Sequence, residues 1–177
     1  MKFQVETWAY CLMPNHIHLI VVPETKDGLN QAIGEAHRRY TRRINFREGW
    51  RGHLWQGRFS SFIMDEGYLL ACTRYVELNP VRAGLVKKPE DWHWSSAGPH
   101  MKGKDDILVK TKPLLEMVNK PWEDFLAIDA QEPEIALFRK HERTGRPLGV
   151  DSFIGTMELL LGRKLKPQKP GPKKKDK

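Results

Sequence analysis

Two histidines, His16 and His18, stand two residues apart, directly after a Met-Pro-Asn turn and at the start of an apolar run. Residues two apart in a strand share a face, so a strand here would place both imidazoles together. Imidazoles are common ligands of divalent metals, and two on one face make half of a metal site. By itself the spacing is weak evidence, because such pairs are more often surface residues or hydrogen-bonded core residues.

A second candidate group lies in residues 65–80. Asp65 is a good N-cap, apolar residues follow, and Asn79-Pro80 ends the pattern, which predicts a helix. Tyr75 and Asn79 are four residues apart and would share one helical face. A phenol there could act as a nucleophile and an amide as a third metal ligand. The competing interpretation is that the tyrosine simply packs and the asparagine simply ends the helix.

The elements that would position these residues are strands and helices in alternation. Residues 3–12 and 16–22 have the patterns of two strands joined by a tight turn. Apolar residues at helical spacing predict a helix over 27–47, and 58–64 has the pattern of a short strand. Residues 92–96 are expected to pack back on the body. Short helices are predicted over 114–118, 122–128, 132–142 and 152–161.

The chain of 177 residues suits one domain with additional segments. We expect a catalytic domain at 1–98 and a helical C-terminal extension at 99–162. A basic, Pro/Lys-rich tail follows at 163–177, and its composition predicts disorder.

The net charge of +8 is concentrated in two zones of the sequence. Residues 162–177 carry eight basic residues against one acid, and residues 37–58 carry seven arginines against Glu48. Two separate basic zones favour a polyanionic partner, most often nucleic acid. The alternative is a solubilising tail together with a charged helix face.

Cysteine usage and hydropathy bear on the cellular compartment. Only Cys11 and Cys72 are present, without a C-x-x-C pair, which argues against a disulfide framework or a cysteine zinc site. No apolar run approaches the ~20 residues of a membrane span. Polar and acidic residues interrupt the N-terminus, so it does not have the pattern of a signal peptide. We expect a cytoplasmic protein, associated with the nucleoid, and no membrane partner.

Several segments, in this order, carry a resemblance to a known family. They are the His-Ile-His strand after Met-Pro-Asn, the Arg-rich helix, Leu54-Trp55-Gln56-Gly57-Arg58-Phe59, residues 75–85, Trp92-His93-Trp94-Ser95-Ser96, and Gly145-Arg146-Pro147-Leu148-Gly149 before a basic tail. The chain resembles the REP-associated tyrosine transposases, which are IS200-like members of the HUH superfamily of single-strand DNA transposases. The resemblance extends over nearly the whole chain.

The resemblance implies a metal-dependent single-strand DNA endonuclease and strand transferase that acts on hairpins of short palindromic repeats. His16, His18 and Asn79 would hold Mg or Mn, and Tyr75 would attack the scissile phosphate to form a 5′-phosphotyrosine. Contacts to the single-stranded hairpin DNA would come from Arg38, Arg39, Arg42, Arg43, Arg58 and Trp55, with Trp50 as an alternative stacking residue. A homodimer is left open.

The family fold is α+β and ferredoxin-like, an antiparallel sheet with helices on one face. This chain begins at the position of the family's second strand, so we expect the first strand and the first helix to be lacking. Three explanations stand side by side. The true start lies upstream of Met1, a second chain fills the gap, or the chain is a decayed remnant with little activity.

Two other classes of function stay open at this point. A catalytically silent protein that holds palindromic hairpins would bind DNA and form no covalent product. A protein with a structural histidine pair would show no salt-dependent DNA binding. The joint presence of His16, His18, Tyr75 and Asn79 favours the enzyme, because a pure binder does not need all four.

Overall fold

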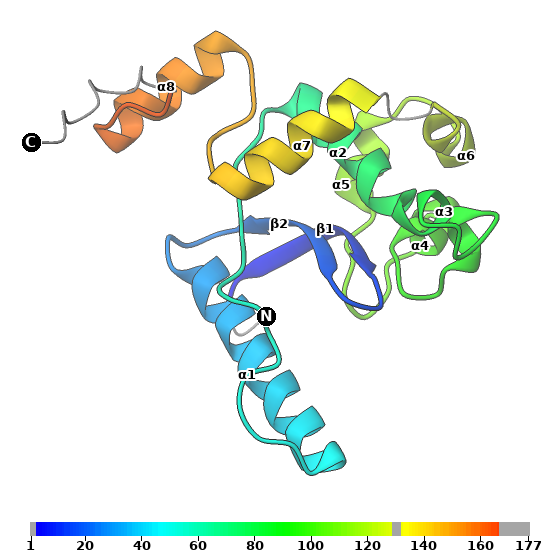
Figure 1. The fold of residues 1–177 in the computed structure, drawn as a ribbon. Helices are drawn as coiled ribbons and strands as arrows, with labels where there is room; N and C mark the ends of the chain where they lie inside the picture. The colour runs from blue at the N-terminus through cyan, green and yellow to red at the C-terminus, as the bar shows by residue number, and fades with distance from the viewer. Residues whose placement is uncertain (1–2, 129–131, 167–177) are drawn as a thin grey trace, which may run out of the picture.

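A computed structural model describes residues 3–128 and 132–166 of the chain (Figure 1). Its elements are β1 (Val5–Leu12), β2 (Ile17–Pro23), α1 (Gly28–Glu48), α2 (Glu66–Glu77), α3 (Asn79–Arg82), a 3-10 turn (Pro89–Asp91), α4 (Ala97–Lys102), α5 (Lys112–Met117), α6 (Trp122–Leu126), α7 (Glu132–Thr144) and α8 (Asp151–Leu161). The described residues thus confirm the α+β class. They contain one two-stranded antiparallel sheet, which leaves the ferredoxin-like topology a prediction.

The β-hairpin forms where the sequence predicts it. The backbone N–H of Met13 donates to the carbonyl of His16 at 2.9 Å and closes the Pro-Asn turn. In the ladder, Cys11 pairs with His18 and Leu12 with Ile17, and a register shift lies between Thr7 and Ala9. The register therefore fixes His18 opposite a buried residue of β1.

Helix α2 begins and ends close to its predicted bounds. The Asp65 carboxylate accepts the backbone N–H of Tyr68 at 3.0 Å, which satisfies one of the unpaired donors of the first turn. The helix contacts both strands, and in Figure 1 it lies with α7 on one side of the hairpin while α1 runs off on the other. Helix α1 ends at Gly49, whose φ of +67° is the left-handed conformation that glycine adopts readily.

The predicted strand over residues 58–64 is wrong. In the structure this segment is extended but irregular, and its one ladder contact is a parallel bridge from Met64 to Leu148. The backbone N–H of Leu148 donates to Ile63 at 2.8 Å, and that of Asp65 to Leu148 at 3.0 Å. A segment with a strand pattern forms a strand only if a neighbouring strand pairs with it. Here the neighbour is a short loop after α7, so no ladder forms.

The four predicted short helices over 114–161 are present as α5 to α8, and α4 is an additional helix that the sequence pattern did not indicate. Residues 92–96 pack back on the hairpin as predicted, since the Trp92 indole donates to Leu12 at 3.1 Å and Ser96 Oγ bonds Tyr10. Of the tail predicted over 163–177, residues 167–177 lie outside the described residues. None of the helices in the part of the chain that is described is long and apolar enough to span a membrane.

The main core joins the two halves of the sequence. It combines the inner face of the hairpin with α2 and with residues from α5, α6, α7 and the loop before α8. Its members include Ala9, Cys11, Ile20, Cys72, Tyr75, Val76, Leu114, Trp122, Phe125, Phe138 and Leu148. Both cysteines are free thiols, and burial raises the pKa of each to about 12, so they serve the core as small apolar groups.

Candidate functional site

The two histidines lie together, His16 directly before β2 and His18 as its second residue. Their ring centroids are 4.8 Å apart, with the rings nearly perpendicular. His16 is exposed, and its Nδ1 lies 2.7 Å from the side-chain oxygen of Asn15, so the Pro-Asn turn orients this ring. The two imidazoles thus lie in one place, as the spacing predicted, although only His18 is part of the strand.

His18 has an electrostatic environment that keeps its imidazole neutral. Burial, then the neighbouring His16 and the guanidinium of Arg82, lower the pKa of His18 to about 4. Its Nε2 is buried and has no hydrogen-bond partner among the described residues. A neutral imidazole with a bare nitrogen is the form that binds a metal ion.

Tyr75 on α2 lies against His18 of β2. Its ring centroid lies 5.5 Å from that of His18 and 5.5 Å from that of Phe138 on α7. The residue is 8% exposed, so the ring is mostly packed. Tyr75 nevertheless lines the same cleft as His16 and His18, and this brings a candidate nucleophile to the imidazole pair.

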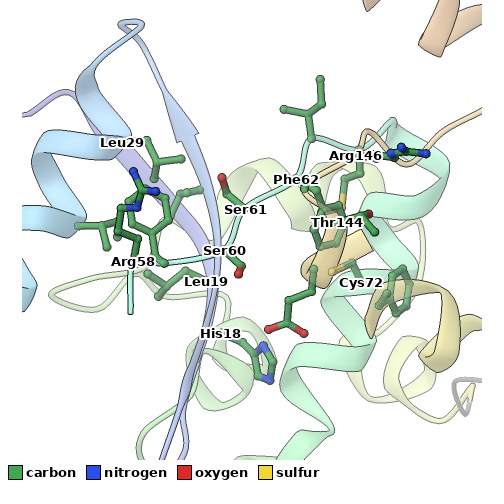
Figure 2. Close-up of a pocket in the computed structure, with 18 of the residues that line it drawn as sticks. His18, Leu19, Leu29, Arg58, Ser60, Ser61, Phe62, Cys72, Thr144 and Arg146 are labelled. Carbon is green, nitrogen blue, oxygen red and sulfur yellow. The ribbon is translucent and has the colours of Figure 1, made fainter. Parts of the chain in front are cut away.

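The cleft has a volume of about 1210 Å³ and opens between β2, the first half of α1, residues 54–64, α2 and the segment after α7. Figure 2 shows His18 on β2, Cys72 on α2, and the segment carrying Ser60 and Ser61 around one open space. Its charged lining is mainly cationic: Arg58, Arg146, Arg163, Lys164 and Lys166, against Glu142. This balance favours an anionic occupant.

An aromatic pair forms part of the wall on the α1 side. The Trp55 ring stacks on His37 at a centroid distance of 3.9 Å and an interplanar angle of 12°, and its indole donates to the His37 carbonyl at 3.3 Å. Tyr40 lies 5.6 Å from the Trp55 ring and is 52% exposed. Trp55, His37 and Arg58 all line the cleft, where an aromatic surface and a cation suit single-stranded nucleic acid.

Five of the predicted site residues lie elsewhere. Asn79 begins α3, is half-buried, and is absent from the cleft lining within the described chain. The helix-α1 arginines, Arg38, Arg39, Arg42 and Arg43, do not line it either. Arg38 and Arg39 both bind the Glu35 carboxylate, at 2.8 Å and 2.7 Å.

The sequence interpretation also missed functional candidates. His37, Arg146, Arg163 and Lys164 line the cleft, and Arg82 contacts Tyr75, but none of these was singled out. The basic composition after residue 162 pointed to Arg163 and Lys164. Composition alone could not show that this segment lines the cleft.

The residues present fit a divalent metal ion with open coordination positions. Two imidazoles lie within 4.8 Å of each other, and the buried Nε2 of His18 lacks another partner in the described chain. Among described residues there is no cluster of three or more His, Cys, Asp or Glu that could form a closed site. A ligand set of two imidazoles would leave room for phosphate oxygens and water.

The sequence is similar to known transposases over part of its length. Residues 1–79 match the family model described as "Transposase IS200 like". A Haemophilus influenzae protein with the provisional name REP-associated tyrosine transposase is 31% identical over 105 residues, which is 53% of this chain and 60% of the relative. The REP-associated tyrosine transposase of Escherichia coli K12 is 25% identical over 95 residues, covering 53% of this chain and 54% of the relative. No solved structure gives a significant match.

These matches confirm the resemblance inferred from the motifs: over part of its length the chain is similar to IS200-like transposases and to REP-associated tyrosine transposases. The matched part spans little more than half the length of each of these two relatives. The family match ends at residue 79, so it includes the histidine pair and Tyr75 and stops before Arg82 and the C-terminal side of the cleft.

Proposed function

We propose that this protein is a metal-dependent single-strand DNA endonuclease and strand transferase that acts on hairpins of palindromic repeats. The observation that carries the proposal is the convergence of His16, His18 and Tyr75 on one cationic cleft. The relationship to IS200-like transposases supports the same reaction class. The expected place of action is the nucleoid in the cytoplasm, where single-stranded hairpins arise.

The residues of the cleft would have different roles in such a reaction. His16 and His18 would hold a divalent ion, and Asn79 stays the predicted third ligand although it does not line the cleft in the described chain. Mg or Mn bound there would polarise a phosphate oxygen and offset the negative charge that develops during attack. Arg58 and the C-terminal cations would hold neighbouring phosphates, and Trp55 would stack on a base.

The chemical step is a transesterification at phosphorus. The Tyr75 oxygen forms a bond to the phosphorus, the bond from phosphorus to the 3′ oxygen breaks, and the 3′ oxygen takes up a proton as the phenol loses one. The 5′ end is then linked to Tyr75 through a phosphodiester. Because that bond keeps its energy, the 3′-hydroxyl of another strand could reverse the step and join the DNA without ATP.

A covalent-adduct assay tests this proposal. The protein is mixed with single-stranded hairpin DNA from the flanks of its own gene and with Mn or Mg, and the products are separated on a denaturing gel. We expect an SDS-stable, metal-dependent adduct that is lost in Tyr75→Phe and kept in Tyr68→Phe, a control on the same helix. Hairpin binding without any adduct would instead identify a catalytically silent binding protein.

A further inference from the structure

Arg82, the last residue of α3, contacts the proposed nucleophile in two ways. Its guanidinium carbon lies 4.4 Å from the centroid of the Tyr75 ring, which places the cation over the ring face. Its Nη2 also donates a hydrogen bond to the backbone carbonyl of Tyr75 at 2.6 Å. One side chain therefore engages both the ring and the main chain of the same residue.

These contacts complete an enclosure of the Tyr75 ring. His18 meets the ring at a 74° interplanar angle and Phe138 at 50°, both at 5.5 Å between centroids. Arg82 adds a planar, charged group to this set, and the ring is left 8% exposed. A ring confined in this way has few other rotamers open to it, so its orientation is fixed before any substrate binds.

The contact also has an electrostatic component. A cation over an aromatic face is attracted to the ring. The hydrogen bond from the same guanidinium to the Tyr75 carbonyl fixes where the cation lies. Arg82 would thus hold the Tyr75 ring in its place on the helix.

We propose that Arg82 is a positioning residue for Tyr75, which holds the ring in the orientation needed for attack. This inference rests on the proposed function, in which Tyr75 is the nucleophile. It extends the site past residue 79, where the family match ends. Arg82 itself does not line the cleft, so it acts through Tyr75 and not on the DNA.

The chain offers a matched control in Arg74. Its guanidinium carbon lies 5.1 Å from the centroid of the Phe125 ring, so it makes the same kind of contact. Phe125 belongs to the core and does not line the cleft. Replacing Arg74 removes an arginine–aromatic contact near Tyr75 without touching the Tyr75 ring face.

The experiment compares wild type, Arg82→Gln, Arg82→Lys and Arg74→Gln. The rate of adduct formation is measured in single turnover with saturating hairpin DNA and Mn, and hairpin affinity is measured separately without metal. For Arg82→Gln we expect the rate of adduct formation to fall by about tenfold and the affinity for the hairpin to stay unchanged. A change in rate of about tenfold is the size of effect that a partly buried cation–π contact gives. Arg82→Lys should recover part of the rate, because it keeps the charge and loses the planar group. Arg74→Gln should match wild type.

Two kinetic outcomes would overturn the inference while leaving the proposed function intact. One is an Arg82→Gln protein that forms the adduct at the wild-type rate. The other is a loss of hairpin affinity in Arg82→Gln with an unchanged rate at saturation, which would make Arg82 a phosphate contact.

A measurement without DNA separates failure of this inference from failure of the proposed function. The chain has four tyrosines, so in a protein labelled with 13C at the tyrosine ring the Tyr75 NMR signal is identified by its loss in Tyr75→Phe. We expect Arg82→Gln to shift the Tyr75 signal and to leave those of Tyr10 and Tyr40 in place. An unshifted Tyr75 signal would show that Arg82 does not contact the Tyr75 ring, and this would overturn the inference. A shifted signal in a protein whose wild type forms no adduct overturns the proposed function and, with it, the catalytic role of Arg82.

Discussion

The indole Nε1 of Trp122 donates a hydrogen bond at 2.8 Å to the carboxylate of Glu77, a fully buried residue two positions after Tyr75. The same carboxylate accepts Ser96 Oγ at 2.5 Å and His100 Nδ1 at 2.6 Å. Ser96 in turn bonds the backbone of Tyr10 on β1. The helix that carries Tyr75 is therefore tied to the hairpin and to α4 and α6 through one buried acid.

Removal of the Glu77 carboxylate should destabilise the protein strongly. Glu77→Ala would leave the buried Trp122 and His100 donors without this acceptor and Ser96 Oγ with only the Tyr10 carbonyl, and breaking such a network costs about 3–5 kcal/mol. Urea unfolding followed by circular dichroism measures the change in the free energy of unfolding. The control is Glu116→Ala, whose exposed pair with Lys112 should contribute less than about 1 kcal/mol. Equal stability losses in the two variants would contradict the structural role of Glu77.

Replacement of His16 should weaken metal binding with little effect on folding. His16→Ala removes one of two imidazole ligands, and we expect the affinity for Mn to fall by about tenfold or more. His16 is exposed, so the free energy of unfolding should change by less than about 0.5 kcal/mol. Isothermal titration calorimetry with Mn alone gives the affinity. His93→Ala removes another exposed histidine and should leave the affinity unchanged; equal affinities in both variants and wild type would exclude a site at His16.

Trp55 should contribute more to DNA binding than Trp50. One face of the Trp55 ring is stacked on His37, and the residue lines the cleft, where a base could stack on the other face. A stacked base contributes about 1–3 kcal/mol, so Trp55→Ala should weaken hairpin binding by that amount. Fluorescence anisotropy with a labelled hairpin measures it. Trp50, which is 59% exposed and outside the cleft lining, provides the comparison. A larger loss in Trp50→Ala would move the stacking site away from the cleft.

Glu35→Gln tests whether the arginines of α1 contact DNA. Hydrogen bonds from Arg38 and then Arg39 lower the pKa of Glu35 to about 2, so this carboxylate is charged and occupies both guanidinium groups at neutral pH. The substitution would free both arginines for phosphates. If they contact DNA, hairpin affinity should rise and its salt dependence should steepen by about 0.7 per added phosphate contact. Glu48→Gln, which frees Arg47 at the end of the same helix, is the matched control. Unchanged affinity in Glu35→Gln would exclude the α1 arginines from the DNA path.

The hairpin and α2 could be predicted because their signals are local. The Pro14-Asn15 turn fixes the strand pairing, and Asp65 caps the helix through the N–H of Tyr68. These two elements carry the histidines and Tyr75. Together with the family resemblance, they allowed us to predict that the three residues share one site. The residues that form this part of the site lie within the strongest short-range patterns of the chain.

The rest of the site depends on contacts between distant segments, which spacing does not encode. Arg58 to Met64 has a strand pattern, but its only pairing partner in the described chain is Leu148, so no strand forms. Asn79 has the spacing of a ligand, yet α2 ends at Glu77 and Asn79 belongs to the next short helix. Arg82 reaches Tyr75 because the chain turns there, which no periodicity indicates.

The buried glutamate also sets an order of events during synthesis of the chain. Ser96, His100 and Trp122 follow Glu77 by 19, 23 and 45 positions, so they leave the ribosome after it. Until Ser96 and His100 have emerged, the Glu77 carboxylate has none of these partners and remains in contact with water, because burying it alone is unfavourable. Its third partner, Trp122, comes later still, so we expect α2 to reach its final packing only when translation has passed well beyond it.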